Sequence, residues 1–270
     1  MCDMIIHSEY ENLLEETKKL QAELSTLIME RDELKHHICK NIQTEYILKL
    51  GTLEYKVFEF QCKILRIKRK IEIIQAHFNR QEIVNIIEIE VKLDFEYSEY
   101  QKKLDEKMND INEALERNSM NTLTPEETEE LKKTYKQIVK KLHPDINPNV
   151  TEGELKLFNQ AVEAYKSGDI QIIRSIAVMI SEISVHEEIA DSMKVLKEKI
   201  DKLKQMIADV LKEIEQIKQS FPYNQKELLS NSEKVKECQD ELNVLLDEYR
   251  KIYAIYEQKL NDMLGGLDNG

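Results

Sequence analysis

The stretch YKQIVKKLHPDINPN, residues 135–149, differs from the rest of the chain. Elsewhere Lys, Glu, Ile and Leu recur at helical spacing with few interruptions. Here a lysine-rich helix must end at His143-Pro144, because a proline disfavours helical geometry at the residue that precedes it. Asp145 follows as a carboxylate on an exposed loop. The stretch therefore predicts a helix that stops at a charged corner.

Two short helices with matched apolar faces flank this corner. The first begins at Thr124, a good N-cap, with Pro125 at the first helical position and Glu127 completing a capping box. It runs to about Leu142, and the second helix spans about residues 152–166. Each has a single apolar stripe, so we expect the two to pack as an antiparallel pair. The expected core of the pair is Leu131, Tyr135, Ile138, Leu142, Leu155, Phe158, Val162 and Tyr165.

The opposite face of the first helix is basic. Lys132, Lys136 and Lys140 are four residues apart, with Lys141 beside them. Like charges at this spacing cost an isolated helix a few tenths of a kcal/mol each, so folding alone does not require the stripe. Acids precede the lysines, however, and the helix dipole favours that order. A binding face and a solvated face both remain open from the residues alone.

The lysine-rich helix, the His-Pro-Asp loop and a second helix that ends in Ala-Tyr together resemble the J domain of DnaJ-type co-chaperones. The resemblance covers residues 121–168. The matching residues are Tyr135, Lys136, Ile138, Lys141, Leu142, His143, Pro144, Asp145, Asn147, Pro148, Phe158, Ala164 and Tyr165. It implies a module that binds a DnaK-type heat-shock chaperone in its ATP state and stimulates ATP hydrolysis.

The same resemblance assigns roles to the residues of the corner. It implies that a basic face meets an acidic surface on the chaperone and that the His-Pro-Asp loop contacts the region joining the chaperone's two domains. The implied chaperone-binding residues are His143, Pro144, Asp145, Lys132, Lys136, Lys140 and Lys141. The usual aromatic-then-Leu-Gly first helix is missing before Thr124, and the candidate for its place is the helix end around Leu104 to Leu115.

Outside residues 121–168 the chain has the composition of long exposed helices. It has only four prolines and six glycines in 270 residues, and 34% of its residues are charged. Such a chain buries narrow heptad seams rather than one large core. We expect an all-α fold in which long antiparallel coiled-coil helices flank a small J-domain-like helical hairpin.

The heptad seams suggest a division of the chain. Apolar residues repeat at spacings of three and four over residues 193–217 and again over residues 235–256, with a break at Ser220 to Asn224. Two such seams predict an antiparallel hairpin. The expected parts are an N-terminal helical arm (1–120), the J-like module (121–168), a connecting buried helix (169–184) and a C-terminal antiparallel coiled-coil hairpin (185–270). Gly51 is either a sharp reversal or a kink.

Several classes of function are disfavoured by composition. The formal net charge of −13 argues against general nucleic-acid binding, although Arg66 to Lys70 (RIKRK) forms a local basic cluster. The four cysteines lack a Cys-x-x-Cys pair and predict neither a zinc site nor a disulfide framework. No apolar run approaches the length of a membrane span, and no signal peptide is evident, so we expect a cytoplasmic protein.

No catalytic constellation or phosphate-binding loop is present, so we expect neither an enzyme nor a cofactor or metal. The residues lead to two hypotheses. In the first, the chain is a co-chaperone that recruits and activates a DnaK-type chaperone, while its coiled-coil arms bind a client or hold a homodimer. In the second, it is a structural scaffold whose J-like module is degenerate and does not stimulate. The intact His143-Pro144-Asp145 and the lysine stripe favour the first.

Overall fold

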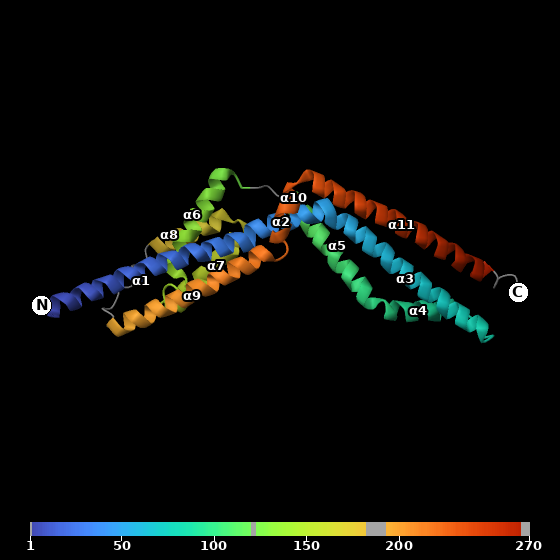
Figure 1. The fold of residues 1–270 in the computed structure, drawn as a ribbon, viewed down its shortest axis with the longest axis horizontal. Coiled ribbons are helices and arrows are strands. Elements are labelled where there is room, and N and C mark those ends of the chain that lie inside the picture. Colours follow the sequence, from blue (N-terminus) through green and yellow to red (C-terminus); the bar gives the residue numbers. More distant parts are fainter. Residues whose placement is uncertain (1, 120–122, 182–192, 266–270) are drawn as a thin grey trace. The chain divides into compact units, whose positions relative to one another are not determined.

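The computed structural model describes residues 2–119, 123–181 and 193–265 (Figure 1). Over these ranges the regular secondary structure is helical, without a strand. The predicted all-α class is therefore confirmed. Among the same residues, no helix combines the length and the apolarity needed to cross a membrane.

The chain divides into two compact units, each built from two separate stretches. Unit 1 contains Met1–Asn41 and Asn121–Asn224, and unit 2 contains Ile42–Met120 and Gln225–Gly270. The arm expected over residues 1–120 and the hairpin expected over residues 185–270 are each divided between the two units.

Unit 1 is organised around two long parallel helices, α1 (Cys2–Glu33) and α9 (Met193–Gln219). Lys197 and Lys218 lie 188 residues after their glutamate partners, with Nζ to Oε1 distances of 2.9 Å. Glu16 and Lys204 keep the same offset at 2.8 Å. A constant offset means that the helices run in the same direction, in heptad register. The seam buries Leu24, Ile28, Leu196, Ile200, Leu203, Ile207, Val210 and Ile214.

The same unit contains three shorter helices, α6 (Pro125–Leu142), α7 (Glu152–Ser167) and α8 (Ile170–Ser181). Both α6 and α7 begin with a complete capping box, at Thr124 and Thr151. The first box confirms the predicted start of α6. Helix α7 ends at Gly168, whose φ of 72° is a left-handed conformation that glycine adopts without strain.

Helix α8 packs against both α6 and α7. It buries the side chains of Ile170, Ile173, Ile176 and Ile180. Its other face is open, since Ile172 and Met179 are about half exposed at 46% and 55%. The connecting helix that we predicted over residues 169–184 is therefore buried on one face only, and residues 182–184 lie outside the described part.

Helical backbone continues after α1 through a π-helical segment (Leu34–Ile38), α2 (Cys39–Tyr46), a second π-helical segment (Ile47–Gly51) and α3 (Thr52–Asn79). A π-helical turn contains an additional residue, which rotates the following helix face relative to the preceding one. Gly51 has helical dihedrals of −58° and −33°. A reversal of the chain at Gly51 is thereby excluded.

Unit 2 contains a second parallel pair, α3 and α11 (Ser232–Gly265), preceded by the short α10 (Lys226–Ser230). The ring centroids of Phe60 and Tyr253 are 6.0 Å apart, and the Lys68 ammonium lies 4.9 Å from the ring centroid of Tyr256. Residue numbers rise in both helices from the first contact to the second, so the two helices run in the same direction. Ile252 belongs to the apolar repeat predicted over residues 235–256, but its side chain is 37% exposed, while Tyr253 packs against the core in its place.

The predicted antiparallel C-terminal hairpin is wrong in both partner and direction. Helix α9 pairs with α1 in unit 1, helix α11 pairs with α3 in unit 2, and each pair is parallel. The physical reason is that a heptad seam specifies which face of a helix is buried, but not which seam covers it.

Two more helices, α4 (Ile86–Glu96) and α5 (Ser98–Ser119), pack against α3 and complete unit 2. Acids of α4 bind the basic cluster of α3. Arg66 lies 2.5 Å from Glu90, Lys70 lies 2.6 Å from the same carboxylate, and Arg69 lies 2.9 Å from Glu96. The basic cluster that the sequence left open is thus largely neutralised within the chain.

Candidate functional site

The corner at residues 143–145 lies on a well-packed pair of helices. On α6 all four predicted core residues, Leu131, Tyr135, Ile138 and Leu142, are at most 2% exposed. On α7 Phe158 and Tyr165 are buried as predicted, and Val162 is partly buried against the same core.

Leu155 was assigned to this core, and that assignment is wrong, because its side chain is 37% exposed. The buried face of α7 instead runs through Glu154, Phe158, Ala161 and Tyr165. Glu154 is buried because its carboxylate turns back to the backbone N–H of Thr151, at 2.7 Å, to close the capping box. The sequence contains the signal for this arrangement in the Thr-x-x-Glu spacing.

The backbone of the corner is closed by a compact set of hydrogen bonds. The N–H of His143 donates to the carbonyl of Val139 at 3.0 Å, and the His143 carbonyl accepts from the N–H groups of Ile146 and Asn147 at 3.0 and 2.9 Å. The side-chain amide of Asn147 donates to the carbonyls at positions 140 and 141, at 2.9 and 2.8 Å. These last carbonyls of a helix otherwise lack partners. Asn147 therefore caps α6 and holds the loop against it.

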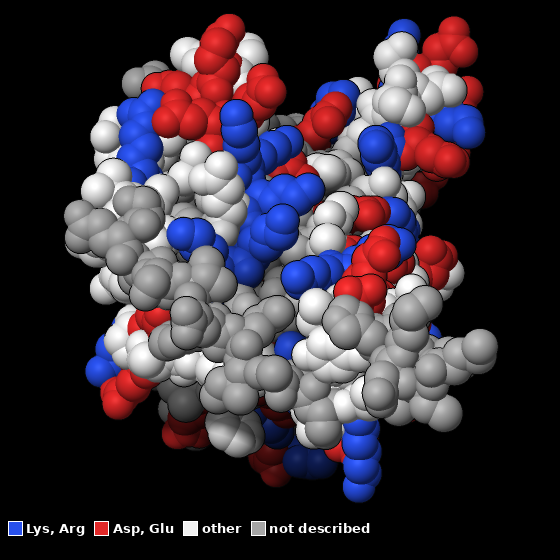
Figure 2. All heavy atoms as spheres, turned by 90° about the vertical axis from the view of Figure 1, so that its left-hand side faces the viewer, with Lys and Arg blue, Asp and Glu red and all other residues white. Residues whose placement is uncertain are grey.

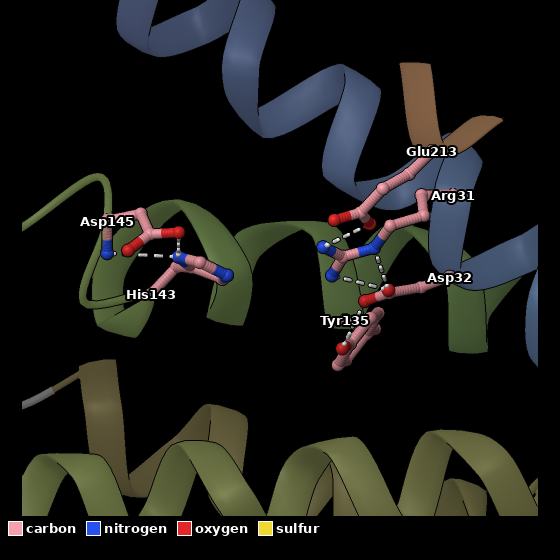
Figure 3. Close-up of polar contacts among 6 residues, drawn as sticks. All are labelled: Arg31, Asp32, Tyr135, His143, Asp145 and Glu213. Atoms are coloured by element: carbon pink, nitrogen blue, oxygen red, sulfur yellow. Dashed lines mark hydrogen bonds and ion pairs between the residues drawn. The ribbon is translucent and has the colours of Figure 1, made fainter. Parts of the chain in front are cut away.

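His143 and Asp145 have different surroundings (Figure 3). The imidazole of His143 is buried, meets the ring of Phe158 edge-on at 5.1 Å, and accepts the backbone N–H of Asp145 on Nδ1 at 3.1 Å. The carboxylate of Asp145 lies 3.9 Å from that nitrogen, and its side chain is 54% exposed. His143 thus supports the loop from inside, while Asp145 presents a charge to solvent.

The predicted lysine face divides into two pairs. Lys132 is held by Glu33 of α1 at 2.8 Å, and Lys141 donates to the carbonyl of Ile180 at 3.1 Å. Lys136 and Lys140 are exposed and have no ion-pair partner within the described part of the chain. Figure 2, which faces the left-hand side of the view in Figure 1, shows a group of lysine and arginine side chains below a group of acidic ones. Of these four lysines, only Lys132 is paired with an acid, while Lys141 keeps its charge and Lys136 and Lys140 present theirs to solvent.

Helix α1 packs on the pair formed by α6 and α7, at the position where the resemblance would require a first helix. Leu24 and Ile28 lie in the same core as α6 and α7, and the amide of Gln21 donates to the carbonyl of Ile146 at 3.1 Å. We expected the end of the helix around Leu104 to Leu115 in this role. That expectation is wrong, because those residues belong to α5 in unit 2.

A buried polar cluster joins α1 to α6 near the middle of the module (Figure 3). Asp32 is 5% exposed and accepts hydrogen bonds from the Tyr135 hydroxyl at 2.9 Å and from the Arg31 Nε and Nη2 at 3.0 and 2.8 Å. Glu213 of α9 lies 3.6 Å from the same guanidinium. Burial raises the pKa of Tyr135, and the Asp32 carboxylate raises it further, so the hydroxyl stays protonated as a donor.

The next residue of α1 binds the second tyrosine. The Tyr165 hydroxyl donates to Glu33 at 2.5 Å, and its ring stacks on that of Tyr135 with centroids 4.0 Å apart. Burial opposes ionisation of Glu33, but hydrogen bonds from Lys132 and Tyr165 outweigh it and lower the pKa of Glu33. Two consecutive residues, Asp32 and Glu33, therefore fix both α6 and α7 to α1.

Stability of the corner is expected to depend on pH through His143. Burial lowers the pKa of His143 below its usual value of 6.5, with Asp145 opposing the shift. The unfolded chain then binds this proton at a higher pH than the folded chain, so the contribution is complete above about pH 6.5 and decreases as the pH falls further. Urea unfolding at pH 7.5 and 5.5 should show a larger loss for the wild type than for His143→Gln. An equal loss in both would remove His143 as the cause.

The described residues contain no group of three or more His, Cys, Asp or Glu side chains placed to hold a metal ion. No protein-family model matches the chain, and no curated protein or solved structure shows significant similarity to it.

Proposed function

We propose that residues 121–168, supported by α1, form a J-like module that binds a DnaK-type chaperone and stimulates its ATPase. The observation that supports this most is the exposed carboxylate of Asp145, presented on a loop that His143 and Asn147 hold in one conformation. Such a loop loses little freedom on binding, which favours affinity.

The charges beside Asp145 fit a two-part contact. Lys136 and Lys140 point a positive face to solvent one to two turns before the corner, where they would speed the encounter with an acidic surface. Asp145 would then pair with an arginine of the chaperone through charge-assisted hydrogen bonds, which also fix orientation. The remaining long helices would bind the client or hold two copies together.

One observation favours the second candidate, a structural scaffold with a non-stimulating module. Lys132 and Lys141, two of the four lysines in the expected footprint, are engaged within the chain. In that case the positive face would be only partly available to a partner.

Single-turnover ATP hydrolysis by a DnaK-type chaperone from the same organism distinguishes the two candidates. The co-chaperone proposal expects faster hydrolysis on addition of the full chain and loss of that effect in the His143→Gln variant. If the folded wild type leaves the hydrolysis rate unchanged, the scaffold is the better description.

The lysine face leads to a prediction on association kinetics. Replacing both Lys136 and Lys140 with Gln should slow association with the chaperone and flatten its dependence on ionic strength, because exposed charges act mainly on the encounter rate and are screened by salt. Stopped-flow association between low and physiological salt measures this.

The matched control replaces Lys202 and Lys212 of α9 with Gln. Both are exposed, and their loss makes the same change in net charge. If the two double variants slow association equally, the effect comes from net charge rather than from the α6 face.

A further inference from the structure

Helix α4 is apolar on two opposite faces. Ile89 and Leu93 are buried against unit 2, at 3% and 0% exposure. Ile87, Val91 and Phe95, which are four residues apart, point to solvent with exposures of 76%, 64% and 84%. Ile83, in the loop that enters the helix, is 93% exposed. A contiguous row of large exposed apolar side chains is typical of an interaction surface.

We propose that this row is the contact between two copies of the chain, with α4 packed antiparallel against α4 about a two-fold axis near residue 90. Residues at spacing four form a ridge that can pack into the matching groove of an identical helix. In a two-fold contact the same patch serves on both sides, so the patch must be complementary to itself.

The charges on one flank of the row have this self-complementarity. Glu88 and Lys92 are both exposed and lie one turn apart on the same side of Ile87 and Val91. When two such helices pack antiparallel about residue 90, Glu88 of each copy lies opposite Lys92 of the other. The flank therefore forms two equivalent ion pairs.

The other flank carries Glu90 and Asp94, whose charges would repel across the two-fold axis. Arg66 of the same chain lies 2.5 Å from Glu90 and 2.7 Å from Asp94, and Lys70 binds Glu90 as well. These cations offset the acids before the copies meet. A second copy of α4 thus satisfies the apolar row and both flanks, whereas an apolar client segment without an ordered charge pattern would satisfy only the row. The contact does not depend on whether residues 121–168 bind a chaperone.

Sedimentation equilibrium of the full chain over a range of concentrations tests the contact. The wild type should dimerise, and Val91→Glu should raise the dissociation constant at least tenfold, because it buries a charge in the middle of the row. The side chain of Val91 is exposed in the single chain, so the variant should fold normally and retain its helical circular dichroism.

The control is Ile255→Glu on α11, where an isoleucine is also well exposed, at 67%. It should dimerise like the wild type. A wild type that stays monomeric at every concentration, or equal weakening by both variants, would overturn the proposal. Binding of an unfolded polypeptide to a monomeric wild type would overturn it too, and would assign the row to clients.

A charge exchange tests the antiparallel arrangement directly. Glu88→Lys and Lys92→Glu should each weaken the dimer, and the double variant with both changes should recover it. When the two single variants are mixed, they should associate with each other more tightly than either does with itself, since one carries two positive and the other two negative charges on this flank. If the double variant remains as weak as the single ones, the two-fold arrangement is wrong.

Discussion

Under the proposed function, Asp145→Asn is expected to lower chaperone stimulation about tenfold or more while leaving the stability of the chain nearly unchanged. A hydrogen bond to a charged group contributes about 1.5–3 kcal/mol, which corresponds to at least a tenfold loss when its charge is removed. The Asp145 side chain is 54% exposed and lies 3.9 Å from the nearest His143 nitrogen, so folding gains little from it. Exposed substitutions of this kind usually change stability by less than about 0.5 kcal/mol.

Two further variants separate a role in binding from a role in folding. Glu152→Gln removes an exposed carboxylate, 83% accessible, at the start of α7, and it should stimulate like the wild type. His143→Gln should lose stimulation and some stability together, because its imidazole is buried against Phe158. Single-turnover hydrolysis and urea unfolding of the three variants provide both readouts. If Asp145→Asn is as active as Glu152→Gln, the corner is not the trigger.

Asp32→Ala is expected to destabilise the chain by about 2–4 kcal/mol. Removal of one partner from a buried charge pair typically costs about 3–5 kcal/mol, and the remaining exposure of Arg31, at 25%, reduces that somewhat. The change also leaves the hydroxyl of Tyr135 without its acceptor, in a side chain with 0% exposure.

Denaturant unfolding followed by circular dichroism measures the effect. Tyr135→Phe should cost less, about 1 kcal/mol, because Asp32 keeps its bonds to Arg31. Glu23→Ala, an exposed acid on the same helix, should change little and is the matched control. An Asp32→Ala variant as stable as Glu23→Ala would show that the polar cluster does not hold α1 to α6.

The sequence predicts features of this fold that depend on near neighbours in the chain. The Thr124 capping box and the stop at His143 are set by residues within one turn, and the structure has both. The apolar face of α6 was predicted correctly at four positions, because a regular stripe on a short helix leaves one choice of buried side.

Features that depend on distant residues were predicted poorly. Nothing local distinguishes a seam that meets α1 from one that meets α11, so both the partners and the direction of the long helices differ from the prediction. Likewise, Arg31, Asp32 and Glu33 have the pattern of ordinary exposed charges on a helix. Their role follows from tyrosines that lie 103 and 132 residues further along the chain, at positions 135 and 165.

The parallel pairing of α1 with α9 has a consequence for synthesis of the protein. The lysines of α9 that pair with glutamates of α1 are translated 188 residues after those glutamates. At a rate of roughly 5–20 residues per second, this delay lasts about 10–40 seconds. During that time the apolar seam of α1 has left the ribosome without the helix that covers it. A nascent chain of this kind requires either temporary shielding of α1 or folding that waits until about four-fifths of the chain has been made.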